Sequence, residues 1–225
     1  MIKKYCSAFF SFLFINILLI NFLFAQKKVS ELTIVYDYIL SSNGNSAKPA
    51  SGSDGATNTI YIKGNMSRSE MASSLYSSTT IFDANANSGV ILKEVSGQKL
   101  LIRLSPANIQ QINKTYEGLT FTNSSETKTI AGYKCIKAVA TTKDGYTFTV
   151  FYTNEIVPEN RNYNAKFKNL DGLPLEYELN NGTLSIKYTV AKINLNPVPA
   201  SKFDIPKSGY RELTYEESKK LDIRN

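Results

Sequence analysis

Apolar and polar residues alternate with a period of two in the C-terminal half of this chain. In Leu173–Leu179 the odd positions are apolar or aromatic and the even ones are Pro or Glu, and alternation returns in Leu184–Val190. Such alternation is typical of strands with one buried face. Asn180-Asn181-Gly182 between the runs favours a type I′ turn, which needs positive φ at both central positions. The pattern therefore predicts a β-hairpin.

Similar strand signals recur along most of the chain. Two further hairpins are predicted, around Asp144-Gly145 and around Ser96-Gly97. The other predicted strands and hairpin arms are Leu32–Leu40, Thr59–Lys63, Thr79–Asp83, Val90–Val95, Lys99–Leu104, Leu119–Thr127, Tyr133–Thr142, Tyr146–Thr153, Ala165–Asn169 and Asn194–Asp204. Short strands that follow one another along the chain favour a meandering antiparallel sheet with one buried face.

Helix signals are few. Ser105-Pro106 fits an N-cap followed by Pro at the first helical position. Thr214 with Glu217 forms a capping-box pattern that predicts a short C-terminal helix. Ser67 and Glu70 have the same spacing but lie among strand-like segments. The sequence is therefore compatible with either a helix or a strand at residues 67–70. The expected fold class is therefore mainly β with few helices.

No internal repeat and no linker of domain scale interrupts these patterns, so residues 26–225 are predicted to form a single β domain. One segment inside it differs in composition. Residues 41–56 are rich in Ser, Gly, Asn and Ala, which predicts a mobile loop between the first two strands.

The N-terminus has the pattern of a secretory signal peptide. Lys3 and Lys4 precede the apolar run Ala8–Phe24, and the small residue Ala25 stands before the polar Gln26. We expect residues 1–25 to be removed and the protein to work in the periplasm or outside the cell. Because the residue after the cleavage point is not Cys, no lipid anchor is expected. A retained anchor is the alternative, although the run is only marginally long enough to cross a bilayer.

Composition excludes several chemistries. The chain has no His, which rules out Ser-His-Asp triads, Cys-His dyads and His-ligated zinc. Cys135 is the one Cys beyond the signal segment and is expected to be buried and inert. No glycine-rich phosphate loop is present. We therefore predict no catalytic residues, no metal ligands, no cofactor and no enzymatic activity.

Charge gives little indication of a partner. The net charge is +7, but Lys and Arg are spread along the chain without a basic tract, so nucleic acid is not expected as a partner. Glu176 and Glu178 lie two apart on one predicted strand, opposite its apolar face, and are expected to point to water. A His-free hydrolase would instead need two carboxylates beside one cleft.

Aromatic side chains on the predicted strands are the remaining signal. They are Tyr36, Tyr38, Tyr146, Phe148, Tyr152, Tyr177 and Tyr188. Aromatic residues pair across strands and fill cores. The same side chains would also suit an apolar concave face that binds a lipid-like ligand. Both interpretations stay open, because the two uses have the same composition.

Several short motifs occur in a characteristic order. They are Ile130-Ala131-Gly132-Tyr133-Lys134-Cys135, Phe151-Tyr152-Thr153, Gly172-Leu173-Pro174-Leu175 and, near the end, Phe203-Asp204-Ile205-Pro206 with Gly209-Tyr210. The order resembles the secreted GLPGLI-like family of Bacteroidetes-type bacteria, and the last motif resembles the closing strand of lipoprotein-carrier (LolA-like) folds. The resemblance implies a strongly curved antiparallel sheet forming an incomplete barrel, with one or two helices on its apolar concave side. It also implies carriage of acyl chains or lipophilic molecules.

Three functions follow as hypotheses. The first is a periplasmic, non-catalytic binding protein that holds a lipophilic ligand or lipid moiety, its partner being a lipid or a lipoprotein acyl chain. The second is a structural or interaction protein of the envelope with a filled core and an envelope protein as partner. The least favoured is the His-free carboxylate hydrolase. A monomer is expected in each case, and an open or a filled concave face would separate the first two.

Overall fold

The computed structural model describes residues 26–42, 48–49, 57–72, 76–95, 97–180 and 184–222. The predicted signal peptide lies outside these ranges. Most of the predicted loop at 41–56 also lies outside them, and its described positions 41–42 and 48–49 belong to strands.

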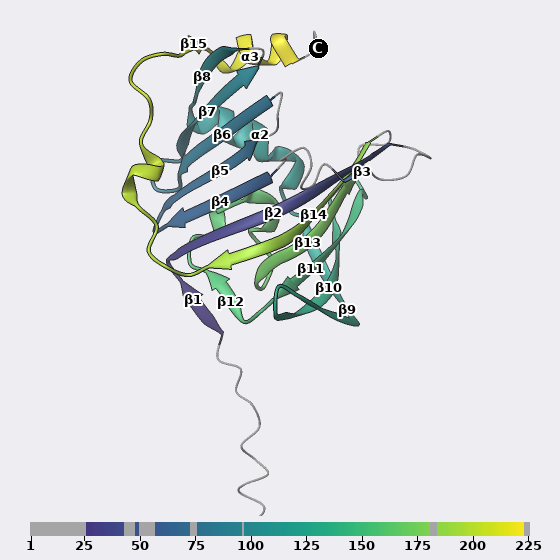
Figure 1. Ribbon diagram of the computed structural model, residues 1–225. Coiled ribbons are helices and arrows are strands. Elements are labelled where there is room, and N and C mark those ends of the chain that lie inside the picture. The colour runs from purple at the N-terminus through teal and green to yellow at the C-terminus, as the bar shows by residue number, and fades with distance from the viewer. Residues whose placement is uncertain are drawn as a thin grey trace, which may run out of the picture.

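Thirteen strands form one curved sheet that does not close into a barrel (Figure 1). In order across the sheet they are β15 (Arg211–Leu213), β8 (Gln98–Leu104), β7 (Ser88–Val95), β6 (Tyr76–Asp83), β5 (Met66–Ala72), β4 (Thr57–Lys63), β2 (Glu31–Ser42), β14 (Leu184–Asn194), β13 (Leu173–Asn180), β11 (Thr147–Thr153), β10 (Tyr133–Thr141) and β9 (Thr120–Ile130), with β3 (Lys48–Pro49) beside β2. All neighbours are antiparallel except β15 and β8. The predicted fold class is confirmed.

The sheet consists of two meanders joined by one long-range pairing. Strands β2 and β4 to β8 follow one another toward one edge, strands β9, β10, β11, β13 and β14 run inward from the other edge, and β2 pairs with β14 over ten residue pairs. The connection from β8 to β9 must therefore pass from one edge region to the other. Helix α2 (Pro106–Asn113) and the 3-10 helix η1 (Lys114–Tyr116) make this crossing on the concave side (Figure 1).

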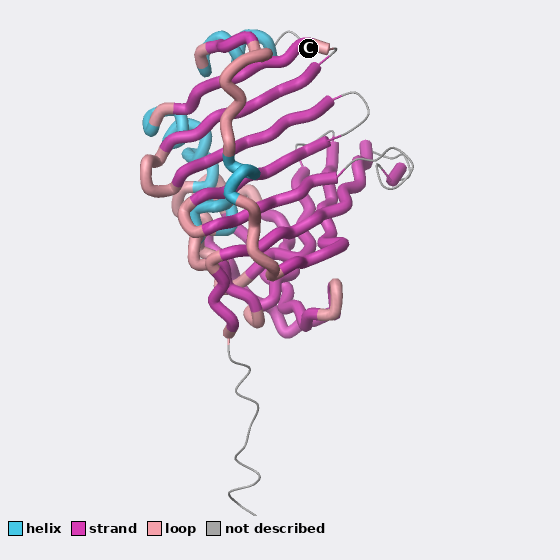
Figure 2. Tube along the Cα trace, turned by 60° about the vertical axis from the view of Figure 1, so that its left-hand side comes forward, coloured by secondary structure: helices cyan, strands magenta, loops and turns pink. Residues whose placement is uncertain are grey.

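The outer face of β5–β8 is covered by the C-terminal segment. After β14 the chain crosses this face through η4 (Ala200–Phe203), as Figure 2 shows. Phe203 and Tyr210 pack there against a cluster that contains Ile81 and Leu101. The chain then forms α3 (Tyr215–Asp222), the predicted C-terminal helix. A small parallel pair, β1 (Lys27–Val29) with β12 (Ile156–Pro158), lies beside the large sheet.

All three predicted hairpins are present as strand pairs, namely β13 with β14, β10 with β11 and β7 with β8. Residues 181–183 and 96 of two turns lie outside the described ranges. In the third turn Gly145 has φ +86°, and its amide donates to the carbonyl of Thr142 over 3.1 Å. Glycine fits this position because it adopts positive φ without strain.

Two predicted strands were wrong. Residues 165–169 instead contain the 3-10 helix η3 (Ala165–Phe167), whose first turn is capped by the side chain of Asn164. Residues 194–204 leave the sheet after Asn194, because Pro197 and Pro199 have no amide proton to donate to a strand neighbour. The open question at residues 67–70 is settled as strand β5, which pairs on both sides.

Candidate functional site

An aromatic cluster covers the inner face of the sheet where β2, β13 and β14 meet. Tyr177 lies at its centre, with ring-centroid distances of 4.7 Å to Tyr188, 4.8 Å to Phe167 and 5.9 Å to Tyr36. These three strands are adjacent in the sheet, and period-two alternation points the tyrosines to the same side. Phe167 comes from η3 and packs on them from the concave side. We call these four residues the aromatic cluster.

The structure connects most of the other predicted aromatic residues to this cluster. Tyr38 lies 5.9 Å from Tyr188, and Phe148 lies 6.4 Å from Phe167, measured between ring centroids. Tyr152 is buried in the same hydrophobic core, and its hydroxyl donates to Asn123 over 3.1 Å. Tyr146 differs because 38% of its surface is exposed. All seven thus contact other protein groups, Tyr146 through a ring that lies 6.2 Å from that of Phe148, and ligand binding by them stays a prediction.

Lys166 brings a positive charge into this aromatic region. The residue is only 9% exposed, and its Nζ lies 5.2 Å, 5.4 Å and 5.8 Å from the ring centroids of Tyr116, Tyr177 and Phe167. Its ammonium has no hydrogen bond or ion pair with any described residue. Burial lowers the pKa of Lys166 to about 8. The rings attract the cation through cation–π contacts, but none of them neutralises it.

Tyrosine hydroxyls surround the same region. The hydroxyl of Tyr36 donates to the carbonyl of Pro174 over 2.8 Å. The hydroxyl of Tyr163, from η2 (Arg161–Tyr163), is buried and has no partner within the described part of the chain. Burial raises the pKa values of Tyr36, Tyr177 and Tyr163, and it raises that of Tyr188 to about 12. These groups therefore stay protonated at neutral pH and act as hydrogen-bond donors.

A cavity of about 760 Å³ opens between the helical segments of the concave side. Helix α2 and η1 form one wall, η2 and η3 form another, and the β6–β7 turn closes one end. Its lining is mixed: the apolar and aromatic side chains are Phe82, Ala84, Ala107, Tyr116 and Ala165, the charged ones are Lys114, Glu117 and Lys168, and the amides are Asn87, Gln110, Gln111, Asn113 and Asn162. Tyr116 belongs both to this cavity and to the surroundings of Lys166.

Sequence reasoning missed the groups that join the aromatic face to the cavity. Lys166 and Phe167 lie in the segment that was predicted as a strand, and Tyr163 lies just before it. The available signal was the recurrence of Asn160, Asn162 and Asn164, since Asn side chains cap short helical turns. Two of these asparagines do so, each accepting from the amide two residues later.

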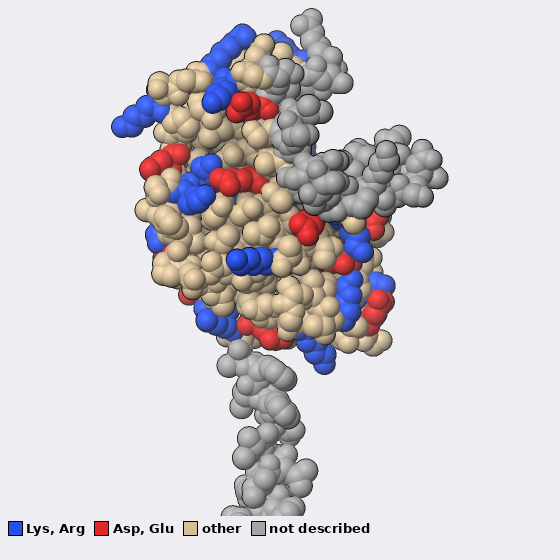
Figure 3. Space-filling view, in the orientation of Figure 1, with Lys and Arg blue, Asp and Glu red and all other residues tan. Residues whose placement is uncertain are grey.

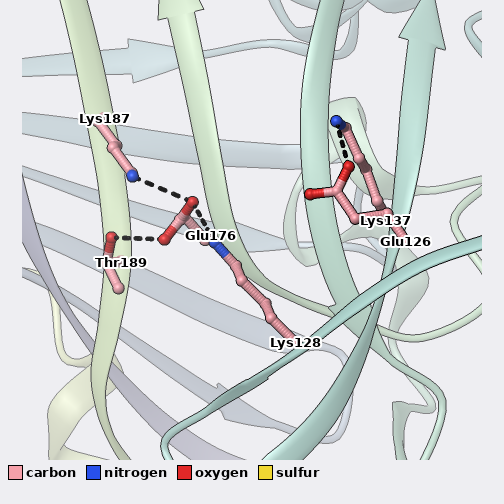
Figure 4. A network of polar contacts seen from close by, with 6 residues as sticks. All are labelled: Glu126, Lys128, Lys137, Glu176, Lys187 and Thr189. Carbon is pink, nitrogen blue, oxygen red and sulfur yellow. Dashed lines mark hydrogen bonds and ion pairs between the residues drawn. The ribbon is translucent and has the colours of Figure 1, made fainter.

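The Glu176 carboxylate lies on the face of β13 opposite Tyr177, where Lys128, Lys187 and Thr189 converge on it (Figure 4). The two lysines lie 2.6 Å and 3.2 Å from it, and Thr189 donates over 3.4 Å. Burial alone would raise the pKa of Glu176, but the hydrogen bonds from both lysines outweigh it and lower the pKa. A general acid of a hydrolase needs a raised pKa. Glu176 is therefore not suited to act as such a general acid.

Three further carboxylates, from Glu212, Glu216 and Glu217, line a hollow of about 400 Å³ beside α3. Each one already has a partner: Arg103 at 2.6 Å, Lys219 at 3.3 Å and the amide of Thr214 at 2.7 Å, respectively. A lowered pKa of Glu217, due first to that amide, keeps it ionised. These contacts account for all three carboxylates within the described structure.

Other candidate chemistries find no support in the described residues. Cys135 is fully buried, and burial raises the pKa of its thiol to about 11, which makes it unreactive at neutral pH. Among the described residues no group of three or more acidic or Cys side chains is placed to hold a metal ion. No described helix has the length and apolar character to span a membrane. Charges of both signs are dispersed over the face shown in Figure 3.

No family model matches the chain, and no curated protein sequence matches it. Solved structures that it resembles include PNGF-II in two crystal forms, at 14% and 16% identity with TM-scores of 0.46 and 0.48. These likenesses cover 85% and 84% of this chain, which spans only 32% and 33% of the PNGF-II chains. A LolA superfamily protein from Nitrosomonas europaea is 12% identical with a TM-score of 0.38, over 78% of this chain and 90% of that one.

Proposed function

We propose that the protein is a non-catalytic binding protein of the periplasm or the cell exterior, which holds a lipophilic ligand or lipid moiety on the concave side of a LolA-like half-barrel. The observation that carries the proposal is the cavity of about 760 Å³ beside the aromatic cluster. Its volume is in the range of small-molecule sites, roughly 300–1,000 Å³. The resemblance of the closing motif Phe203-Asp204-Ile205-Pro206 to LolA-like folds supports the same role.

The walls of the cavity suit a ligand with an apolar portion. Phe82, Ala107 and Ala165 present apolar surface to it, and Tyr116 adds an aromatic face. Short 3-10 helices make up much of the wall, and their hydrogen-bond geometry is poorer than that of α-helices. We therefore expect η1 and η3 to shift when a ligand enters, so that an acyl chain reaches the aromatic cluster.

Binding is tested with N-phenylnaphthylamine, a neutral lipophilic dye whose fluorescence rises in apolar surroundings. Ala165→Trp would fill the cavity from the first residue of η3, and we expect dye affinity to fall at least about tenfold. Ala200→Trp is the matched control, because Ala200 is the first residue of the 3-10 helix on the outer face. Native mass spectrometry of protein from its own envelope fraction should show a bound lipid. Two outcomes would contradict the proposal. One is absence of dye binding to the wild type, and the other is dye affinity that Ala165→Trp leaves unchanged.

An envelope interaction protein is the second candidate, and the edge strand β9 favours it. Among the described strands this one pairs with β10 alone, so no described strand covers its outer backbone groups and a further strand could pair with them. A pull-down from envelope extract tests this candidate. Ser125→Pro would disturb the β9 edge, and we expect it to abolish capture of the partner if that edge is the docking site.

A further inference from the structure

Lys166 is a largely buried cationic residue for which no described residue acts as a counter-ion. It is 9% exposed, and its ammonium has no polar contact with a described residue. Buried charges in proteins are ordinarily paired, because the loss of hydration is costly. The surrounding rings of Tyr116 and Tyr177 offset only part of that cost. An anion is the group that would complete this site.

Hydrogen-bond donors stand near the same position. The Tyr163 hydroxyl is buried without a partner among the described residues, and Tyr163 packs against the same hydrophobic core as Tyr177, from η2, which contacts η3. Tyr177 in turn lies beneath the Lys166 ammonium. A neutral hydroxyl and a cation both donate to an anion, and a charge-assisted hydrogen bond is stronger than a neutral one.

The cavity adjoins this position through Tyr116 and carries an excess of positive charge. Tyr116 lines the cavity and also faces Lys166, and Ala165 and Lys168 flank Lys166 on η3. Lys114 and Lys168 line the cavity against one acidic residue, Glu117, and neither lysine has an ion pair with a described residue. The local charge therefore favours a negatively charged ligand over a neutral one.

We propose that the ligand is an anionic amphiphile, whose carboxylate or phosphate head group is bound by Lys166 and the Tyr163 hydroxyl while its chain occupies the cavity. This inference rests on the proposed function and specifies its ligand class. Specificity follows from the site itself, because a neutral alcohol of the same chain length would leave the buried ammonium unpaired.

Displacement of N-phenylnaphthylamine by palmitate, hexadecyl phosphate and hexadecanol measures the contribution of the head group. We expect the wild type to prefer one or both anions to hexadecanol by roughly tenfold or more. Lys166→Met keeps the length and apolar stem of the side chain and should remove this preference. Tyr163→Phe removes only an unpartnered hydroxyl and should reduce the preference severalfold. Whichever of palmitate and hexadecyl phosphate displaces the dye at the lower concentration identifies the preferred head group as carboxylate or phosphate.

Lys202→Met is the matched control, because Lys202 also lies over a tyrosine ring, that of Tyr61, from a 3-10 helix of the outer face. It should leave all affinities unchanged. Equal displacement of the dye by hexadecanol and by both anions would overturn the inference, and so would an anion preference that persists in Lys166→Met. In either case the dye still binds, so the proposed function is unaffected. Absence of dye binding to the wild type would overturn both.

Discussion

A buried ammonium without a counter-ion destabilises a fold, because apolar surroundings replace its hydration. The pKa of Lys166 falls from 10.5 to about 8 for this reason, so at neutral pH the folded protein retains a charge that burial disfavours. A residue that costs stability and occupies the wall between an aromatic cluster and a cavity is typical of a binding site. The proposed anion site rests on this placement beside the aromatic cluster.

We expect Lys166→Met to raise the free energy of unfolding at pH 7 by about 1–3 kcal/mol, because an apolar side chain of similar length replaces the buried charge. The folded-state pKa of about 8 lies below the unfolded value of 10.5, so wild-type stability rises with pH between them. The difference in unfolding free energy between Lys166→Met and the wild type should therefore decrease as the pH rises from about 8 to 10.5. Urea unfolding at several pH values measures this, and a variant less stable than wild type would contradict it.

Glu176→Gln tests the opposite face of β13. The substitution leaves Lys128 and Lys187 without their shared carboxylate, and we expect it to cost roughly 1–3 kcal/mol of unfolding free energy. Because the pKa of Glu176 is lowered in the folded state, its contribution is present above the unfolded value of 4.5 and disappears as the pH falls through the folded value. Glu178→Gln, an exposed position on the same strand, is the control. An equal loss of unfolding free energy in Glu176→Gln and Glu178→Gln would show that the contacts with Lys128 and Lys187 do not cause the loss.

At the scale of elements, clean alternation predicted strands well. Leu173–Leu179 and Leu184–Val190 lie almost wholly within β13 and β14, because one buried face imposes that period. Strand β5 is largely polar, with the sequence Met-Ser-Arg-Ser-Glu-Met-Ala, and pairing on both sides rather than a hydrophobic face holds it in the sheet. The pairing of β2 with β14 is likewise set by the whole sheet, which local patterns do not encode.

The candidate site was predictable only where it lies on strands. Tyr36, Tyr177 and Tyr188 follow from alternation, and the structure places their rings in contact. Lys166 and Tyr163 lie on 3-10 turns stabilised by asparagine side chains, which have no hydrophobic period. The polar half of the site therefore needed the tertiary structure.

Gly172 is required where β13 begins beside β11. A Cβ atom there would overlap the carbonyl oxygen of Thr153 and lie 2.9 Å from ring carbon Cδ2 of Tyr152. We expect Gly172→Ala to cost roughly 2–3 kcal/mol, because backbone must shift to relieve the overlap. Gly145→Ala, at a positive φ but in open space, should cost only about 1 kcal/mol. Thermal unfolding measures the stability of both variants. A loss of stability in Gly172→Ala that is equal to or smaller than that in Gly145→Ala would contradict the steric argument.

At the scale of the whole molecule, the two faces of the sheet are covered in different ways. The outer face of β5–β8 is closed by the C-terminal segment, whose Phe203 and Tyr210 pack into a hydrophobic cluster. The concave side is spanned by the connection between the two sheet edges, and the cavity of about 760 Å³ lies against this connection. The same topology that prevents closure of the barrel thus leaves room for a ligand on one face.

Hydrogen exchange should reveal this asymmetry. We expect palmitate to slow amide exchange in residues 106–117 and 161–168 by roughly tenfold, because a ligand in the cavity suppresses opening of the short helices around it. Residues 200–213 cross the opposite face and should exchange at the same rate with and without palmitate. Mass-spectrometric exchange on the wild type and on Ala165→Trp provides the measurement. Protection confined to residues 200–213 would place the ligand on the outer face and contradict a concave binding site.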